Sequence, residues 1–259
     1  MARVLSGTSG WMYRGWREHL YADMPMRRWL EVAARTFDTL EINGSFYTQL
    51  TPSTYERFRS ETPVGFRFAV KGHRFVTHYK RLVNCRDSVV RLRDQASHLG
   101  DKLAAVVWQL PSNFPIDLRR LDAFVLALHE WPVRHAIELR HASWFTAAVA
   151  GQLRDAGIAI CLSDAPDFPM WREISADFVY VRLHGHTRKY ASSYSTRSLR
   201  RWAADAAGWR ARKLDVFVYF DNDAEGHAVR NALTFATLIG NASNLTRVQR
   251  KRTDPAVKN

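Results

Sequence analysis

The feature that most constrains the fold of this chain is a regular alternation of short β-type runs with helix-forming sequence. Eight such runs recur along the 259 residues, and nearly all of them end in polar or charged residues. They are Arg3–Gly7, Thr39–Asn43, Phe66–Lys71, Leu103–Gln109, Arg134–Arg140, Ile158–Asp164, Phe178–His184 and Asp215–Asp221. Strands that alternate with helices form βαβ units with a parallel sheet, and eight units predict a closed (β/α)8 barrel of the α/β class.

Helical patterns fill most of the connections between these runs. The predicted helices are Arg27–Thr36, Ser53–Ser60, Ser88–Leu99, Leu118–Leu128, Thr146–Asp155, Leu199–Arg212 and Ala224–Ile239. Pro52-Ser53 is typical of a helix start with a capping residue, and Gly100 and Gly157 stand where helices should end. The connection between the sixth and seventh runs is short and rich in proline, which predicts a poor helix or a single turn there.

Composition favours one barrel domain over residues 1–245, followed by a basic polar tail over residues 246–259. The formal net charge of +13 favours anionic partners such as nucleic acid or phosphorylated metabolites, although a basic surface without such a partner is an equal alternative. We find no signal peptide and no apolar run long enough to span a bilayer. Two cysteines are too few for a disulfide framework, so we expect a cytoplasmic protein without membrane partners.

Alternation within the strands predicts which side chains point into the barrel. Residues two apart on a strand share a face, and the more apolar face should meet the helices. The opposite face carries three acids and three bases near the C-terminal strand ends, namely Glu41, Glu138, Asp221, Lys71, Arg140 and Arg182. Burying one of these charges alone would cost several kcal/mol, so they must pair or meet water or a ligand. A salt-bridge network that only fills the barrel is the alternative to a functional site.

Several short motifs close the strands at this end. Gly7-Thr8-Ser9-Gly10-Trp11 predicts either a tight turn or a loop whose N–H groups cradle an anion. The other motifs are Glu41-Ile42-Asn43 with Phe46-Tyr47, Glu138-Leu139-Arg140-His141 with Ser143-Trp144, Arg182-Leu183-His184-Gly185, and Phe220-Asp221-Asn222-Asp223.

Together these motifs resemble the YecE-like family, a domain of unknown function. The resemblance runs in order from Gly7 to about Ile239, which is nearly the whole chain. It implies a TIM-like barrel, in agreement with the strand count, and brings no established activity, substrate or cofactor. One departure is Asp221, where the resemblance leads us to expect Asn.

Our main hypothesis is an enzyme that acts on an anionic, phosphate-containing substrate at the C-terminal mouth of the barrel. Arg and Lys would clamp the anion, and imidazole groups would move protons near neutral pH. A carboxylate would serve as the base. Hydrolysis, phosphoryl transfer and isomerisation of a sugar phosphate all fit such a set.

The candidate residues follow from the strand ends and the motifs. The catalytic candidates are Glu41, Glu138, His141, His184 and Asp164. The residues expected to bind substrate are Trp11, Asn43, Tyr47, Lys71, His78, Gln109, Arg140, Trp144, Arg182, Tyr194, Asn222 and Asp223.

Three alternatives to this hypothesis use the same end of the barrel. One is a nucleic-acid-binding protein without turnover, which would use the basic surface and stacking aromatic side chains. The second is a metal-assisted phosphodiesterase or endonuclease-like protein with a divalent ion among Glu41, Glu138, Asp164, His184 and Asp223. We do not favour a metal, because nearby Lys and Arg compete for those carboxylates. The third is glycoside hydrolysis by Glu41 and Glu138, which the same basic neighbours disfavour.

Overall fold

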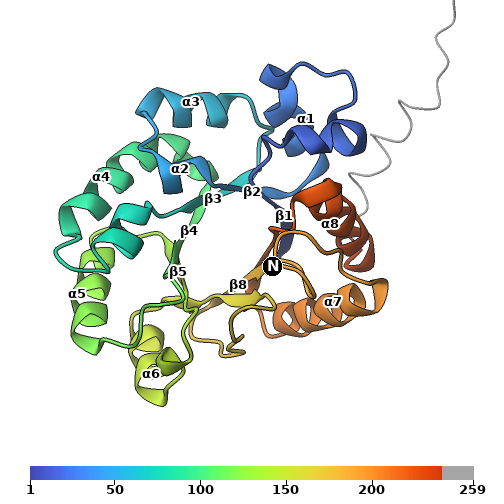
Figure 1. The fold of residues 1–259 in the computed structure, drawn as a ribbon. Coiled ribbons are helices and arrows are strands. Elements are labelled where there is room, and N and C mark those ends of the chain that lie inside the picture. Colours follow the sequence, from blue (N-terminus) through green and yellow to red (C-terminus); the bar gives the residue numbers. More distant parts are fainter. Residues whose placement is uncertain (241–259) are drawn as a thin grey trace, which may run out of the picture.

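The computed structural model describes residues 1–240, and its strands form the barrel that the alternation predicts (Figure 1). All strand pairs are parallel. The strands are β1 (Val4–Ser9), β2 (Thr39–Ile42), β3 (Arg67–Lys71), β4 (Leu103–Gln109), β5 (Arg134–Glu138), β6 (Ala159–Ile160), β7 (Leu162–Asp164), β8 (Phe178–Leu183) and β9 (Asp215–Phe220). The predicted tail and the domain limit at residue 245 lie outside the described residues.

The sixth predicted run closes the barrel although it is divided into two strands. β6 pairs with β5, β7 pairs with β8, and the order across the sheet is β6-β5-β4-β3-β2-β1-β9-β8-β7. Cys161 separates β6 from β7, and its N–H still donates to the Ile137 carbonyl at 2.9 Å. The nine strands therefore occupy the eight positions of the predicted barrel.

Helices surround the strands in a ring (Figure 1). They are α1 (Trp29–Thr36), α2 (Gly44–Tyr47), α3 (Pro52–Ser60), α4 (Arg86–Ala96), α5 (Leu118–His129), α6 (Ala147–Asp155), α7 (Thr196–Ala211) and α8 (His227–Leu238). The capping residue of α3 is Thr51, which accepts from the Thr54 N–H, and not the predicted Ser53. None of these helices is long and apolar enough to cross a membrane.

Short 3-10 and π turns complete the connections. They are η1 (Arg14–Trp16), η2 (Arg17–Tyr21), η3 (Met26–Arg28), η4 (Phe75–Tyr79), η5 (Ser97–Lys102), η6 (Ala142–Trp144) and η7 (Ala224–Gly226). The connection from β7 to β8 has no helix, as its prolines predict. Gly157 ends α6 with a positive φ of 65°, and Gly100 has a φ of 56° inside η5.

Two apolar layers confirm the predicted facing of the strands. The outer layer packs under the helices and contains every predicted outward apolar residue, from Leu40 and Ile42 on β2 to Val218 and Phe220 on β9. The inner cluster combines small residues on β3 to β5, such as Ala69 and Ala136, with large aromatic residues on β8 and β9. Because small and large side chains face one another, the barrel interior is filled below the polar end.

Candidate functional site

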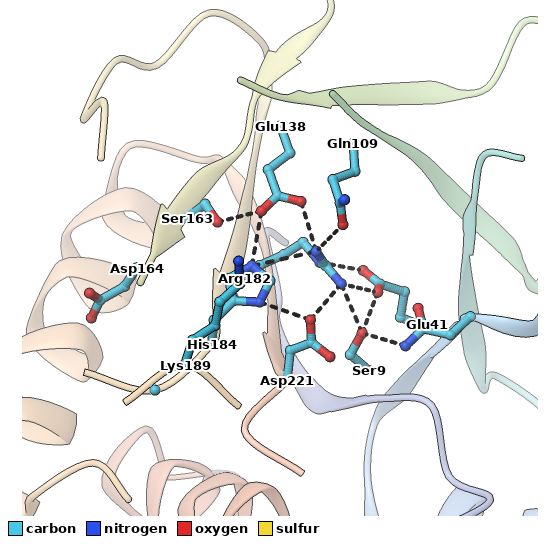
Figure 2. Close-up of polar contacts among 12 residues, drawn as sticks. Ser9, Glu41, Gln109, Glu138, Ser163, Asp164, Arg182, His184, Lys189 and Asp221 are labelled. Atoms are coloured by element: carbon cyan, nitrogen blue, oxygen red, sulfur yellow. Dashed lines mark hydrogen bonds and ion pairs between the residues drawn. The ribbon is translucent and has the colours of Figure 1, made fainter. Parts of the chain in front are cut away.

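Arg182 lies at the centre of a buried ionic network at the C-terminal ends of the strands (Figure 2). Its Nε and Nη2 atoms donate to the two carboxylate oxygens of Glu41 at 3.1 and 2.8 Å. Nη1 donates to Glu138 Oε2 at 2.7 Å, and Nη2 to Asp221 Oδ2 at 2.9 Å. The remaining contacts are with Ser9 Oγ, Gln109 Oε1 and His184 Nε2. A guanidinium has five N–H donors, so Arg182 has none left for a substrate.

Glu138 is the second centre of this network. Its Oε1 atom accepts from Arg140 Nε and Nη2 at 3.0 and 2.9 Å, and from Ser163 Oγ at 2.6 Å. Burial would raise the pKa of Glu138, but the charges of Arg140, Arg182 and His184 hold it well below its usual range. Glu138 is therefore a paired carboxylate that positions its neighbours.

Glu41 is bound from both sides. Its Oε2 atom accepts from the buried Tyr180 hydroxyl at 2.7 Å, and its Oε1 atom accepts from Ser9 Oγ. Ser9 in turn accepts from Asn43 Nδ2 at 2.9 Å. Thr8 and Ser9 belong to strand β1, so the structure does not support the anion-cradling loop, one of the two alternatives for Gly7–Trp11. Ser9 instead uses its side chain to hold Glu41.

His184 joins two of the acids through its two ring nitrogens. Nε2 lies 2.9 Å from Glu138 Oε1, and Nδ1 lies 2.9 Å from Asp221 Oδ2. Burial would raise the pKa of Asp221, but Arg182 and His184 hold it well below its usual range. These contacts fix the end of β9 against β5 and β8.

Two cations at the same end keep unused donors. Lys71, at the end of β3, is 6% exposed, and its Nζ atom has no hydrogen bond or ion pair with any residue from 1 to 240. It lies 4.1 Å from the centre of the Phe46 ring. Burial, with the added charge of Arg182, lowers the pKa of Lys71 to about 8. Arg140 is also buried, packs over Phe168 at 4.5 Å, and has an Nη1 atom without a described partner.

Several neutral or weakly acidic groups accompany these cations. His78 packs edge-on against Phe46 at 5.1 Å, and burial together with Lys71 and Arg140 lowers its pKa to about 4. Asn43 Oδ1 is buried and has no hydrogen-bond partner among the described residues. Burial and the charge of Asp221 raise the pKa of Asp223 to about 6. His78 is therefore neutral at pH 7, while Asp223 titrates close to it.

Three predicted aromatic residues are not exposed at the mouth. Trp11 packs edge-on against Phe58 at 5.2 Å in the outer core, and Trp144 donates from Nε1 to the Phe114 carbonyl at 2.7 Å. The Tyr194 hydroxyl accepts from the Gly185 N–H at 3.1 Å. All three were expected to bind substrate, and all three are buried in the outer core, where they hold the fold near the mouth.

Other predicted residues lie outside the network. His141 Nδ1 accepts from the Ser143 N–H and caps η6. The Asp164 side chain points away from the cluster (Figure 2), and the Asn222 amide holds a loop by donating to the Ser192 carbonyl. Tyr47 is 62% exposed and packs under Arg74.

The structure also adds residues that the predicted site omitted. Ser163 and Tyr180 are on the inward face of their strands, and Asp221 follows β9 in the same inward alternation. The alternation therefore carried a signal for all three. Phe168 lies in the connection between β7 and β8, where no pattern of the sequence predicts its direction.

The donor set does not support the metal alternative. Residues 1–240 contain no group of three His, Cys, Asp or Glu side chains arranged to hold a metal ion. Of the five ligands proposed from the sequence, Glu41 and Glu138 are bound to Arg182 and His184 lies against Glu138, whereas the Asp164 side chain points away.

The fold and the network together define a TIM-like barrel protein with an ionic mouth at its C-terminal strand ends. The chain belongs to the family described as Protein of unknown function DUF72, whose match covers residues 5–256. The expected resemblance to the YecE-like family is therefore confirmed. The UPF0759 protein YunF of Bacillus subtilis is 24% identical over 87% of this chain and 92% of its own length. The UPF0759 protein YecE of Escherichia coli is 29% identical over 50% of this chain and 47% of its own length.

Solved structures agree with this assignment. A DUF72 family protein from Thermotoga maritima superimposes with a TM-score of 0.82 at 26% identity, over 92% of this chain and 99% of its own. A DUF72 family protein from Enterococcus faecalis has a TM-score of 0.78 at 17% identity, over 92% of this chain and 95% of its own. The second likeness concerns the fold alone.

Proposed function

We propose that this protein is an enzyme that binds a small anionic substrate, with a phosphate group as the best match, at the mouth formed by the strand C-termini. The observation that carries the proposal is the contrast between Arg182 and its two cationic neighbours. Arg182 uses all its donors on protein groups and is fully buried, whereas Lys71 and Arg140 are slightly more exposed and retain free donors. A buried cation with free donors is costly unless a ligand or water completes it.

The network changes the roles first given to the acidic residues. Glu41 and Glu138 are bound by Arg182 and cannot leave it without exposing a buried charge. Proton transfer therefore falls to groups with free atoms and pKa values nearer neutrality. Lys71, with a pKa of about 8, and Asp223, with a pKa of about 6, meet that requirement. His78 is neutral at pH 7 and can accept a hydrogen bond from a substrate hydroxyl.

The burial of these cations favours a small substrate over nucleic acid. Lys71 and Arg140 are 6% and 7% exposed, so a nucleic-acid backbone running over the surface would not meet them. Binding of nucleic acid rests on accessible Lys and Arg that contact phosphates along the strand. A single phosphate group on a small molecule is therefore the better match for two buried cations.

Ligand-dependent unfolding tests the proposal. Thermal unfolding is measured with inorganic phosphate, sulfate and a panel of phosphorylated and unphosphorylated sugars. A ligand that binds only the folded chain stabilises it, by about 2.7 kcal/mol at 100 times its Kd. We expect phosphorylated sugars to stabilise the wild-type chain and to have at least a tenfold weaker effect on Lys71→Met.

The control is Lys213→Met, which removes an exposed lysine at the end of the segment after α7. It should bind the same ligands as the wild-type chain. Equal binding by Lys71→Met, or no stabilisation by any anion, would contradict the proposal.

A further inference from the structure

We propose that Lys71 is a nucleophile that forms an imine with the carbonyl group of its substrate, which would be a small aldehyde or ketone carrying phosphate. The inference rests on the proposed anion site and adds the reacting group to it. Its basis is the set of contacts that position the Lys71 amine.

The backbone of Lys71 is fixed from two sides. The buried Ser45 hydroxyl contacts the carbonyls of Ile42 and Lys71 at 2.9 and 2.7 Å, which ties α2 to the ends of β2 and β3. On the other side, the Gly72 N–H donates to the Val107 carbonyl at 2.8 Å. A Cβ atom at position 72 would lie 2.1 Å from the Trp108 ring, so only glycine lets β3 end this close to β4. The amine therefore starts from a rigid position.

The anchoring of α2 also determines what covers the amine. Phe46 follows Ser45 on α2, is 6% exposed, and presents its ring to Nζ at 4.1 Å. An aromatic face attracts an ammonium ion and equally well an iminium ion, because both are cations. It offers no carboxylate that would hold the amine in a permanent ion pair. The result is a desolvated primary amine whose lone pair can be used.

A second buried lysine, Lys102, is fully hydrogen-bonded and serves as a comparison for Lys71. Lys102 is 7% exposed, much like Lys71. Its Nζ atom donates to the carbonyls of Arg59 and Thr62 at 2.6 and 2.7 Å and to Thr62 Oγ1 at 2.9 Å. All three ammonium protons of Lys102 are thus used, whereas those of Lys71 meet no acceptor among residues 1–240.

Burial and the charge of Arg182 give Lys71 a larger neutral fraction near pH 7 than an ordinary lysine has. With a pKa of about 8, set by burial and then by Arg182, about a tenth of the Lys71 amine is neutral at pH 7. A lysine with a pKa near 10.4 is neutral in less than about one molecule in a thousand. Desolvation and a neighbouring cation are the two ways in which proteins activate a lysine for imine formation.

The step balances without an oxidant or reductant. The neutral amine attacks the carbonyl carbon, the carbonyl oxygen takes up a proton, and a second proton transfer to that oxygen releases water as the C=N bond forms. Overall, ammonium and carbonyl give iminium and water. Arg140, through its free Nη1 atom, would hold the phosphate of the substrate, and His78 beside Phe46 would relay protons.

Reductive trapping tests the inference on the full chain. The protein is incubated with sodium cyanoborohydride and glycolaldehyde phosphate, and labelled lysines are located by peptide mass mapping. We expect Lys71 to be labelled at least ten times faster than Lys213 or Lys102, with a rate that rises with pH around 8. Lysines within one chain are compared, so the result does not depend on a variant that folds. Labelling of exposed lysines at the same rate, or an unlabelled Lys71, would overturn the inference.

A matched probe separates this inference from the proposed function. Glycolaldehyde lacks the phosphate and is otherwise the same aldehyde. Selective labelling of Lys71 by both probes at equal rates supports the nucleophile and contradicts the anion site. If inorganic phosphate stabilises the chain against thermal unfolding but Lys71 is not labelled, the anion site is supported and the imine is contradicted. Faster labelling by the phosphorylated probe, competed by inorganic phosphate, supports both.

Discussion

Two regions of the barrel mouth contain the same kinds of charge at nearly the same burial and use them in opposite ways. Around Arg182, every donor of the guanidinium meets a carboxylate, a hydroxyl or an amide oxygen. Beside it, Lys71 touches an aromatic ring, and Arg140 uses only part of its guanidinium. A fully satisfied network specifies geometry, while free donors at the same depth indicate where a ligand belongs.

The difference also separates positioning from chemistry. Glu41, Glu138 and Asp221 come from β2, β5 and the end of β9, and one guanidinium joins them. The network of Arg182 with these three acids, here called the frame, therefore joins distant strands. Lys71 and Arg140, the two cations with free donors, form the rim beside it. A substitution can therefore disturb either the frame or the rim.

The largest effect should follow from removing the centre of the frame. Arg182→Met leaves three buried carboxylates without their shared partner, and breaking a buried ion pair in this way costs about 3–5 kcal/mol. The free energy of unfolding in urea measures the loss. Arg188→Met, at an exposed position, is the control and should change stability by less than about 0.5 kcal/mol. A small loss in Arg182→Met would mean that the network does not support the fold.

Replacing Lys71 in the rim should, unlike replacing Arg182, remove a charge that destabilises the folded chain below pH 8. The pKa of Lys71 is about 8 when folded and about 10.4 when unfolded, so below pH 8 the folded chain carries the full cost of the buried ammonium ion. Between pH 8 and 10.4 the unfolded state binds more protons, and the wild-type chain should gain stability relative to Lys71→Met, on the order of 3 kcal/mol. Urea unfolding of both chains across this range measures the gain. A pH-independent difference would show that Lys71 has a hidden partner.

Asp223 should give a smaller pH dependence of stability, with the opposite sign to that of Lys71. Its pKa is about 6 in the folded chain, above the value of about 3.9 when unfolded, so the folded state binds more protons between these values. Stability should therefore fall as the pH rises from 4 to 6, by up to about 2 kcal/mol after allowing for partial exposure. Asp223→Asn should abolish this slope. If the slope persists in the variant, another group is responsible.

The smallest change in stability should come from removing the hydrogen bonds of Ser45, which hold the backbone of Lys71. Ser45→Ala removes the hydroxyl that joins α2 to the Lys71 carbonyl and should cost about 1 kcal/mol of stability. It should also slow reductive labelling of Lys71, because Phe46 is no longer held over the amine. Labelling at the wild-type rate would show that the position of α2 does not control the amine.

Much of this site could be predicted from the period of two along the strands. That period placed Glu41, Glu138 and Arg182 on the inward face, and the shared ends of parallel strands brought them together. It could not tell a saturated cation from a free one, because the alternation places both Arg182 and Arg140 on the inward side near the C-terminal strand ends. Which donors are used depends on partners up to 173 residues away along the chain, such as Ser9 for Arg182.

The predictions failed where side chains left the strands. Trp11 and Trp144 follow strand ends closely, but a loop residue has no fixed facing, and the packing of both rings against the outer core decided their direction. The aromatic residue that covers Lys71 is Phe46, the neighbour of Tyr47 in the motif after β2. Its direction depends on Ser45, whose contacts only the folded structure reveals.

Asp221 gives this mouth a means of adjustment. Its carboxylate touches Arg182 and His184, and its charge raises the pKa of Lys71 against the effect of burial. Asparagine has nearly the same shape and no charge, so an exchange at this one position would make the lysine a weaker base. The basicity of Lys71 can therefore be altered through a residue with which its amine forms no ion pair.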